Sequence, residues 1–260
     1  HDFARERDGR FLLRIEDIDS ARSRPEFVEA ILADLRWLGL AWDGDVIFQS
    51  DRWESYARAV DRLKAMDVLY RCFCTRSSMR LAQESGAQPE GPDGPIYAGT
   101  CRHLDPAFAA ERARSEPHSW RLDVARAAAM TGPLEWCDER HGEQGTRGEE
   151  LGDVIIVPKD TPVAYHLAVT LDDARDGITH VVRGDDLFAS TDIHRLLQAL
   201  LDLPTPVYFH HPLWRDESGS KLSKSRGSAS LSVLREAGRD GYAQVQDLRR
   251  GIFPVGISLS

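Results

Sequence analysis

Apolar residues along the chain form short continuous runs and longer stretches at helical spacing. Residues 11–15 are a short apolar run followed by acidic residues, which predicts a buried strand. Residues 23–39 begin with Ser-Arg-Pro-Glu, continue with apolar positions on one helical face and end in glycine. This pattern predicts an amphipathic helix capped by Ser23. A second amphipathic helix is expected from Trp53 onward.

Later apolar runs predict further strands, at residues 120–124, 154–157, 178–182 and 207–209. A helix capped by Ser190 lies between the last two. Strands that alternate with helices and end in polar residues predict an α/β fold built on an open, Rossmann-like parallel sheet, with ligands beyond the strand ends. The sequence has no G-x-G-x-x-G after a strand and no G-x-x-x-x-G-K-[ST], which argues against a Rossmann dehydrogenase and a P-loop NTPase.

Residues 72–101 do not follow this alternation of strands and helices, because they are rich in Cys, Gly and Pro and have weak periodicity. We expect a loop-dominated insertion there. Cys72, Cys74 and Cys101 offer three thiolates within it, which suits a tetrahedral zinc site with one further ligand. His103 is the commoner kind of fourth ligand and Tyr97 an unusual one. The alternative is three free cysteines in a loop.

Length and composition bound the class of protein. The 260 residues, 42% of them hydrophobic, suit one large domain or one domain with a small insertion. Four cysteines are too few for a disulfide scaffold. The chain has no apolar run of about 18 residues, and its first ten residues are too charged for a signal peptide, so we expect a cytoplasmic protein without membrane contact. The net charge of −9 argues mildly against nonspecific coating of nucleic acid.

A basic loop near the end of the chain suggests phosphate chemistry. Lys221, Leu222, Ser223, Lys224 and Ser225 follow a glycine and a serine. Two ammonium groups spaced by small hydroxyl residues can surround a polyphosphate, so this loop is a candidate ATP site. A solvated basic turn is the alternative.

Three polar residues near predicted strands or apolar segments are candidates for binding a small substrate. Glu16 follows a strand and can hold an ammonium group, although a surface acid would look the same. Tyr165, next to His166, stands in an apolar segment and either meets a ligand or packs in the core. Arg183 directly follows an apolar run, where a substrate carboxylate would be a good bidentate partner.

Taken in order, these strings are more informative than any one of them. R-I-E-D-I-D, Y-H-L-A-V-T-L-D-D, H-V-V-R-G-D-D-L, H-H-P-L and K-L-S-K-S closely resemble, in sequence order, the glutamyl branch of class I aminoacyl-tRNA synthetases. The resemblance spans residues 10 to about 227. The Cys-x-Cys…Tyr-x-x-x-Cys insertion is similar to the zinc site of the glutamyl-queuosine tRNA(Asp) synthetases, the short paralogues of that branch, and this favours Tyr97 over His103.

The resemblance implies a ligase that activates glutamate with ATP and Mg²⁺ and transfers it to the queuosine base of tRNA(Asp). By motif, Glu16 and Tyr165 would hold the glutamate amino group, and Arg183 its side-chain carboxylate. Lys224, helped by Lys221, would neutralise the ATP phosphates. The family also implies a zinc ion on Cys72, Cys74, Tyr97 and Cys101, and we expect a monomer.

The same resemblance predicts the organisation of the chain. Residues 1–71 would be the first part of the catalytic domain, 72–101 the zinc-binding insertion, 102–227 the rest with a connecting subdomain, and 228–260 a C-terminal segment without an anticodon-binding domain. The ATP-binding turn of the family lies upstream of the strings found here, so we expect the sequence to be part of a longer chain. A truncated glutamyl-tRNA synthetase and an inactive tRNA- or nucleotide-binding paralogue are the alternatives.

Overall fold

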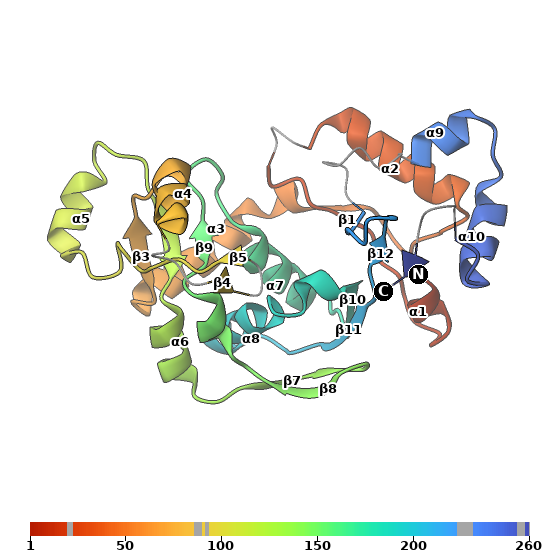
Figure 1. Ribbon diagram of the computed structural model, residues 1–260. Helices are drawn as coiled ribbons and strands as arrows, with labels where there is room; N and C mark the ends of the chain where they lie inside the picture. The colour runs from red at the N-terminus through yellow and green to blue at the C-terminus, as the bar shows by residue number, and fades with distance from the viewer. Residues whose placement is uncertain (20–22, 86–89, 92–93, 223–230, 254–257, 260) are drawn as a thin grey trace. The chain divides into compact units, whose positions relative to one another are not determined.

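The computed structural model describes the chain except residues 20–22, 86–89, 92–93, 223–230, 254–257 and 260 (Figure 1). The chain divides into two compact units. Residues 1–51 and 211–260 form unit 1, and residues 52–210 form unit 2. No helix in the described ranges combines the length and the apolar character needed to span a bilayer.

Unit 1 joins the two ends of the chain. Its elements are α1 (Asp2–Arg5), β1 (Arg14–Ile15), α2 (Pro25–Trp37), β2 (Ile47–Phe48), β12 (Trp214–Arg215), α9 (Leu231–Glu236), α10 (Gly241–Arg249) and β13 (Ser258–Leu259). β1 pairs with β2 in parallel, and β12 pairs with β13 in antiparallel. The short helix η1 (Gln49–Arg52) follows β2 and leads into unit 2.

The predicted first strand and first helix of unit 1 are present in modified form. Only Arg14–Ile15 counts as strand, but the carbonyls of Phe11 and Leu13 already accept hydrogen bonds from residues 43 and 47. The helix begins as predicted at Pro25, but its N-cap is Arg24, without a side-chain cap, so the assignment of Ser23 was wrong. Its apolar face is incompletely covered, since Phe27 is 51% exposed.

Unit 2 contains an antiparallel sheet with strand order β3-β6-β9 and a second sheet with order β10-β11-β7-β8. The first sheet is built from β3 (Leu69–Cys72), β6 (Ser119–Leu122) and β9 (Ile155–Val157). The second comprises β7 (Glu135–Asp138), β8 (Gly142–Gly145), β10 (His180–Gly184) and β11 (Val207–His211). β11 runs parallel to β7, and β8 returns antiparallel to β7.

Helices complete the core of unit 2. α3 (Trp53–Ala65), α7 (Tyr165–Arg175) and α8 (Thr191–Leu201) pack against one another, and α6 (Val124–Thr131) packs on α8 (Figure 1). Leu63, Leu167, Ile193 and Leu197 are fully buried among them. The remaining elements are α4 (Arg76–Glu84), β4 (Glu90–Gly91), β5 (Gly94–Pro95), α5 (Pro106–Arg112), η2 (Gly148–Leu151) and η3 (Asp185–Leu187).

The sheet prediction is therefore correct in part. The chain has an α/β fold with parallel pairs, but the strands at residues 119–122 and 155–157 belong to an antiparallel sheet. Strand direction depends on the partner, and an apolar run carries no information about its partner. The segment 72–101 also contains more regular structure than expected. Thr75 caps α4 with a capping box, in which its hydroxyl accepts a bond from the backbone N–H of Ser78.

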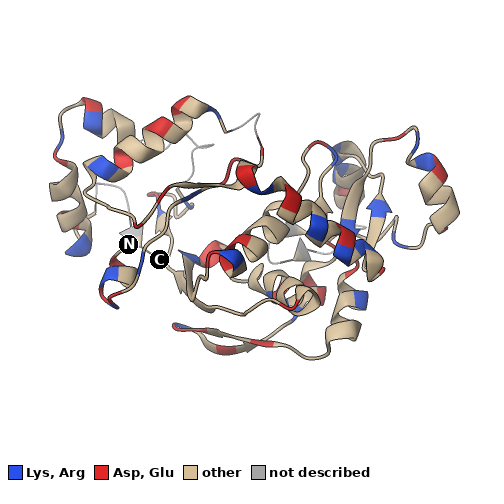
Figure 2. Cartoon of the chain, turned by 180° about the vertical axis from the view of Figure 1, so that it is seen from behind, with Lys and Arg blue, Asp and Glu red and all other residues tan. Residues whose placement is uncertain are grey.

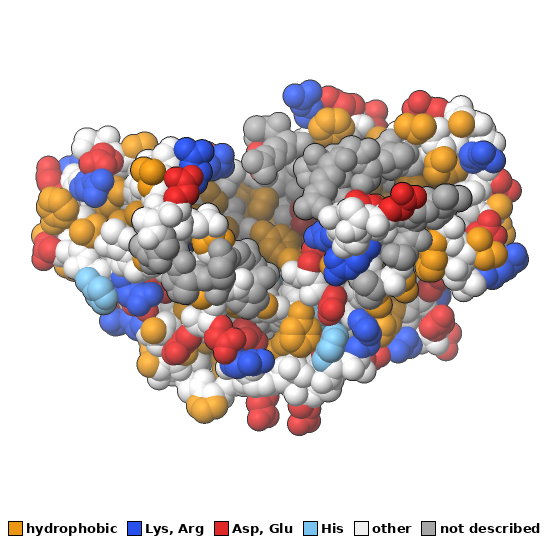
Figure 3. All heavy atoms as spheres, in the orientation of Figure 1, with side chains coloured by type: hydrophobic (Ala, Val, Ile, Leu, Met, Phe, Trp, Pro, Cys, Tyr) orange, Lys and Arg blue, Asp and Glu red, His pale blue; other side chains and the backbone are white. Residues whose placement is uncertain are grey.

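Charged residues are distributed over both units. Figure 2 shows Lys and Arg on the same helices as Asp and Glu. On the face drawn in Figure 3, the two signs are interspersed with hydrophobic side chains. The net charge of −9 is thus spread over the surface rather than gathered in one acidic region on this face.

Candidate active site

Arg183 is the centre of a polar cluster in unit 2. It stands on β10, and its guanidinium donates to four acceptors from the protein. Nε donates to His210 Nε2 at 3.0 Å and Nη1 to His194 Nδ1 at 3.0 Å. Nη2 donates to Thr191 Oγ1 at 2.6 Å and to the Leu187 carbonyl at 3.2 Å. These bonds fix the plane of the guanidinium, and most of its N–H groups donate to protein acceptors.

His210, at the end of β11, connects Arg183 to a buried carboxylate. Its Nδ1 lies 2.7 Å from Asp138 Oδ2, and its backbone N–H donates to the same oxygen at 3.0 Å. Neither side chain is exposed to solvent. Burial would raise the pKa of Asp138, but hydrogen bonds from His210, His141 and two backbone N–H groups lower it to about 2. Burial lowers the pKa of His210, so this imidazole is neutral at physiological pH.

His194 continues the cluster towards Tyr165. The imidazole is 2% exposed, and burial, followed by the charge of Arg183, holds its pKa well below the ordinary value. Its Nε2 lies 3.1 Å from His166 Nδ1. The rings of Tyr165 and His194 are 5.9 Å apart, centroid to centroid. Tyr165 and Arg183, two of the predicted substrate residues, are therefore joined through one histidine.

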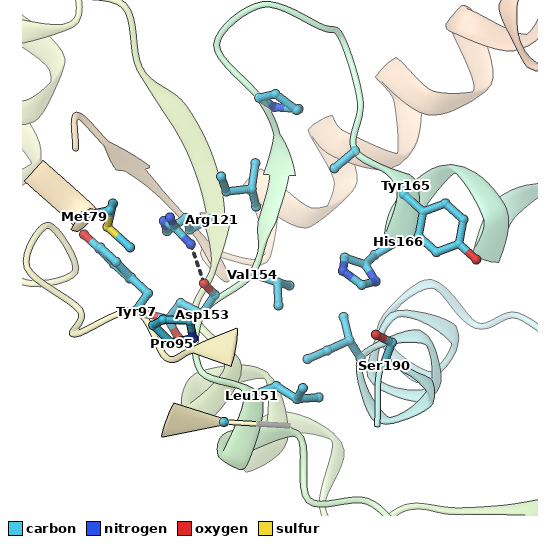
Figure 4. A pocket seen from close by; sticks show the side chains of 15 residues that line it. Met79, Pro95, Tyr97, Arg121, Leu151, Asp153, Val154, Tyr165, His166 and Ser190 are labelled. Atoms are coloured by element: carbon cyan, nitrogen blue, oxygen red, sulfur yellow. Dashed lines mark hydrogen bonds between the residues drawn. The ribbon is translucent and has the colours of Figure 1, made fainter. Parts of the chain in front are cut away.

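A cavity of about 450 Å³ lies beside this cluster (Figure 4). Tyr165 and His166, from the start of α7, line one side together with Ser190. Tyr97 and Arg121 are on the opposite side, next to the cysteine-bearing segment. The cavity thus lies between one candidate substrate residue, Tyr165, and one candidate zinc ligand, Tyr97, inside unit 2.

The three cysteines of the insertion meet at one point. The sulfur atoms of Cys72, Cys74 and Cys101 all lie within 4.8 Å of one another. The Tyr97 hydroxyl is 3.4 Å from Cys72 Sγ and 3.5 Å from Cys74 Sγ. His103 is exposed and lies outside this group. Three sulfurs and one phenol oxygen therefore form a closed set of four donor atoms.

The environment of these thiols differs from one to the next. Burial raises the pKa of Cys72, but its hydrogen bonds with Tyr97 and Arg121 outweigh burial and bring the pKa to about 7. Burial, with the neighbouring thiols, raises the pKa of Cys74 to about 11. Cys72 thus has thiolate character at neutral pH, which is what a metal ligand requires. Cys137 stands apart from this group as an exposed free thiol, whereas its position next to Trp136 in the sequence predicts an ordinary core thiol, so that prediction is wrong.

The other predicted site residues belong to unit 1. Glu16 is exposed directly after β1, and its side chain is 3.9 Å from Arg14. Lys221 pairs with Arg215 in an isolated antiparallel bridge, and the N–H of Leu222 donates to the Trp214 carbonyl at 3.0 Å. The remaining predicted residues of the loop, Ser223, Lys224 and Ser225, lie outside the described residues.

Comparison with known protein families identifies a family that matches almost the whole chain. The model of the catalytic domain of class I tRNA synthetases (E and Q) matches residues 1–258. The chain belongs to this family of class I tRNA synthetases. As a member of the family it is a ligase, and the synthetase domain supports ATP as a substrate.

Relatives of this synthetase domain carry two names. The glutamyl-Q tRNA(Asp) synthetase of Rhodobacter capsulatus is 43% identical over 96% of this chain and 90% of its own. That of Nocardia farcinica is 43% identical over 91% and 72%. A glutamate–tRNA ligase of Synechococcus sp. CC9311 is 38% identical over 91% of this chain and 50% of its own.

Among solved structures, the glutamate-tRNA synthetase of Elizabethkingia anophelis is similar to this synthetase fold. The TM-score is 0.71 and the identity 26%. The match covers 86% of this chain and 48% of that chain, so this chain spans about half the length of that protein.

Sequence reasoning missed the residues that hold Arg183 in this synthetase. Asp138, His194 and His210 were not among the candidate site residues. His210 stands in the H-H-P-L string, but the string alone gave it no role, and Asp138 and His194 lie outside all five strings. One weak signal existed for Asp138. On β7 buried and exposed residues alternate, which places Asp138 on the same inward face as Trp136. A carboxylate on an inward face needs a partner, and this is grounds to search for one.

Proposed function

We propose that this chain activates glutamate with ATP and transfers it to the queuosine base of tRNA(Asp). The observation that carries the proposal is the 43% identity to a glutamyl-Q tRNA(Asp) synthetase over 96% of this chain. The structure supports it with a guanidinium, Arg183, that His210 and His194 hold in place, and with Tyr165, which lines the cavity and lies 5.9 Å from His194 between ring centroids.

The proposed chemistry has two steps. An oxygen of the glutamate α-carboxylate attacks the α-phosphorus of ATP, and pyrophosphate leaves. A ring hydroxyl of queuosine then attacks the carbonyl carbon of the adenylate, and AMP leaves. In such transfers the protein contributes mainly positioning and stabilisation of charge.

Specific residues are proposed for the first step. Glu16 and Tyr165 hold the amino group of glutamate, and Arg183 meets a carboxylate. Lys221 and Lys224 offset the charge that develops on the leaving pyrophosphate. A carboxylate has few donors left on Arg183, because four of the five N–H groups of the guanidinium already donate to His210, His194, Thr191 and Leu187. The remaining N–H, on Nη1, together with the charge, is what a carboxylate would use.

We also propose that Cys72, Cys74, Cys101 and Tyr97 hold a zinc ion. The donor set fits, because three sulfurs within 4.8 Å of one another and a phenol oxygen can form a tetrahedral shell. A closed shell of four protein ligands is typical of structural zinc, so the ion would stabilise the segment 72–101 rather than take part in the reaction.

The decisive experiment is transfer of labelled glutamate to purified tRNA(Asp). The full-length protein should label tRNA(Asp) that contains queuosine and leave tRNA(Asp) without queuosine unlabelled. Nuclease mapping at mildly acidic pH, where the ester survives, should place the label in the anticodon loop. Labelling of both tRNAs, or of the 3′ end, would contradict the proposal.

Glutamate–tRNA ligase is the second candidate, because ligases with that name are 38–41% identical to the chain. The family resemblance implies that such a ligase generally needs its tRNA before it activates glutamate. Glutamate-dependent ATP–pyrophosphate exchange without tRNA therefore separates the two. Exchange in the absence of tRNA favours the queuosine-specific enzyme, and exchange only with tRNA(Glu) favours the ligase.

A further inference from the structure

Among the described residues, Arg183 is a cation whose hydrogen-bond partners are all neutral. Two of them are imidazoles whose pKa burial lowers, and the others are a hydroxyl and a backbone carbonyl. Within the described residues, two carboxylates act on this cluster without a direct bond to Arg183. Asp138 reaches Arg183 through His210, and Asp185 acts on His210 by its charge and lies 3.7 Å from His141 Nε2. A side chain that must bind a substrate carboxylate would lose that capacity if a protein carboxylate paired with it directly.

The bonds around His210 determine where its proton lies. Asp138 is ionised and can only accept, so the proton of His210 is on Nδ1. Nε2 therefore carries a lone pair, which accepts from Arg183 Nε at 3.0 Å. If the proton moved to Nε2, two donors would face each other at that distance.

We propose that Asp138 and His210 are positioning residues for substrate binding: Asp138 fixes the tautomer of His210, and His210 holds Arg183 in place without neutralising it. The proposal rests on the proposed function, because it takes Arg183 as the group that meets a carboxylate of glutamate. Both residues act through Arg183 and need not touch the substrate themselves.

Two amide substitutions separate the two bonds of His210. In His210→Asn, the shorter side chain reaches only the position of Nδ1, so it keeps the bond to Asp138 and loses the acceptor for Arg183. In His210→Gln, the longer side chain reaches the position of Nε2, where its oxygen accepts from Arg183. Both variants retain the backbone N–H bond to Asp138. His180→Asn, on the exposed end of β10, is the matched control.

The test is steady-state ATP–pyrophosphate exchange with the full-length protein. We expect His210→Asn to raise KM for glutamate about tenfold, the effect of losing one hydrogen bond to a charged group, with KM for ATP unchanged. His210→Gln should restore most of the affinity for glutamate, and Asp138→Asn should resemble His210→Asn. His180→Asn should behave as wild type.

The possible outcomes are distinct. If Asn and Gln at position 210 give the same KM for glutamate, or if KM changes only in step with thermal stability, the positioning role is overturned. Wild-type protein without any glutamate-dependent exchange would instead contradict the proposed function. Wild-type exchange with unaffected variants would contradict this inference alone.

Discussion

Arg52, at the start of α3, is a buried cation that is neutralised by its own unit, in contrast to Arg183. Its guanidinium donates to Asp172 at 2.7 Å and to Asp176 at 2.6 and 2.9 Å. Hydrogen bonds to these carboxylates, Asp176 first, raise its pKa. Asp172 also accepts from the Tyr56 hydroxyl at 2.8 Å. One carboxylate on α7 thus ties down two polar side chains near the start of α3.

Replacing Asp172 with alanine should destabilise the fold strongly. The change leaves Arg52 with one carboxylate and removes the acceptor of a buried hydroxyl, and breaking a buried ion pair costs about 3–5 kcal/mol. The free energy of unfolding in urea measures the loss. The control is Asp61→Ala on α3, which removes the exposed carboxylate that pairs with Lys64. This change should lower the free energy of unfolding by less than about 1 kcal/mol. Equal losses in the two variants would show that the buried pair contributes little.

Buried neutral histidine makes stability depend on pH. The pKa of His194 in the folded state is well below 6.5, the ordinary value that applies when the chain unfolds. Below pH 6.5 the unfolded state therefore binds a proton that the folded state does not, and stability falls by up to about 1.4 kcal/mol per pH unit. Asp138 acts in the same direction at lower pH, since its contribution is lost as the pH falls from 3.8 towards about 2.

The variant His194→Gln should flatten the pH dependence. Urea unfolding at pH 7.5, 6.5 and 5.5 should show a shallower decline than in wild type, because the proton-binding group is gone. His103→Gln replaces an exposed histidine and should leave the slope unchanged. A wild-type slope in His194→Gln would mean that other groups cause the acid sensitivity.

At this scale the sequence revealed Tyr165 and Arg183 but not the residues that hold Arg183 in place, although one of them, His210, stands in the H-H-P-L string. Tyr165 and Arg183 were found because each interrupts or follows an apolar run. His210 is 27 residues from Arg183 and 72 from Asp138, so no local pattern connects them. Burial of a charge creates the need for a partner, but only the fold decides which residue meets that need.

Among the elements, the segment 72–101 shows how a small module is attached to a sheet. Asp153 is 2% exposed and accepts from Arg102 Nε at 2.8 Å, from the N–H of Val124 at 3.1 Å and from the Tyr70 hydroxyl. Arg102 follows Cys101 directly. The module is thus linked to β3 and to the start of α6 by one carboxylate.

Removing the proposed zinc should loosen the module and leave the helical core intact. Cys101→Ser should lower bound zinc, measured by mass spectrometry of the purified protein, from about one per chain to well below it. Amide exchange should then accelerate in residues 72–101 but not in α8. Cys137→Ser, which changes an exposed thiol, should retain the metal. The proposed zinc site would be contradicted if wild-type protein, purified without chelator, contained no zinc.

A close approach between α2 and α10 depends on a glycine. A Cβ atom on Gly241 would lie 2.3 Å from the carbonyl oxygen of Trp37 and 2.5 Å from its ring. The indole N–H of Trp37 also donates to the Arg239 carbonyl at 2.9 Å. The ring therefore cannot move aside without losing this bond.

Gly241→Ala should separate the two helices. The overlap is expected to cost about 1–3 kcal/mol and to accelerate amide exchange in α10. Gly145→Ala is the control, because a Cβ there meets nothing within 4 Å. Unchanged exchange in α10 would indicate that the backbone adapts without cost.

For the whole molecule, the sequence predicted the class of fold better than its topology. The strands at residues 155–157, 180–184 and 207–211 lie where apolar runs predicted them, within about two residues. Their apolar side chains are buried in any arrangement of the sheet, so their positions are local information. The antiparallel order β3-β6-β9 is set by pairings such as Leu69 with Leu122 and Arg121 with Ile155, whose partners are too far apart in sequence for a local window to contain them.

Net charge makes a prediction for the whole molecule with tRNA. A protein of charge −9 must hold a polyanion through a few local basic side chains. With two phosphate contacts, raising salt from about 50 to 200 mM should raise KM for tRNA about tenfold, whereas KM for glutamate in exchange without tRNA should stay constant. Equal effects on both constants would contradict a direct phosphate contribution.

The neutral surroundings of Arg183 have a thermodynamic consequence for the protein in the cell. Among the described residues this half-buried cation has no carboxylate bound directly to it, so a carboxylate of the proposed substrate glutamate would stabilise it and would link the free energy of the fold to the concentration of the amino acid. At a concentration one hundred times Kd, the linkage amounts to about 2.7 kcal/mol. The amount of folded enzyme would then follow the supply of its own substrate.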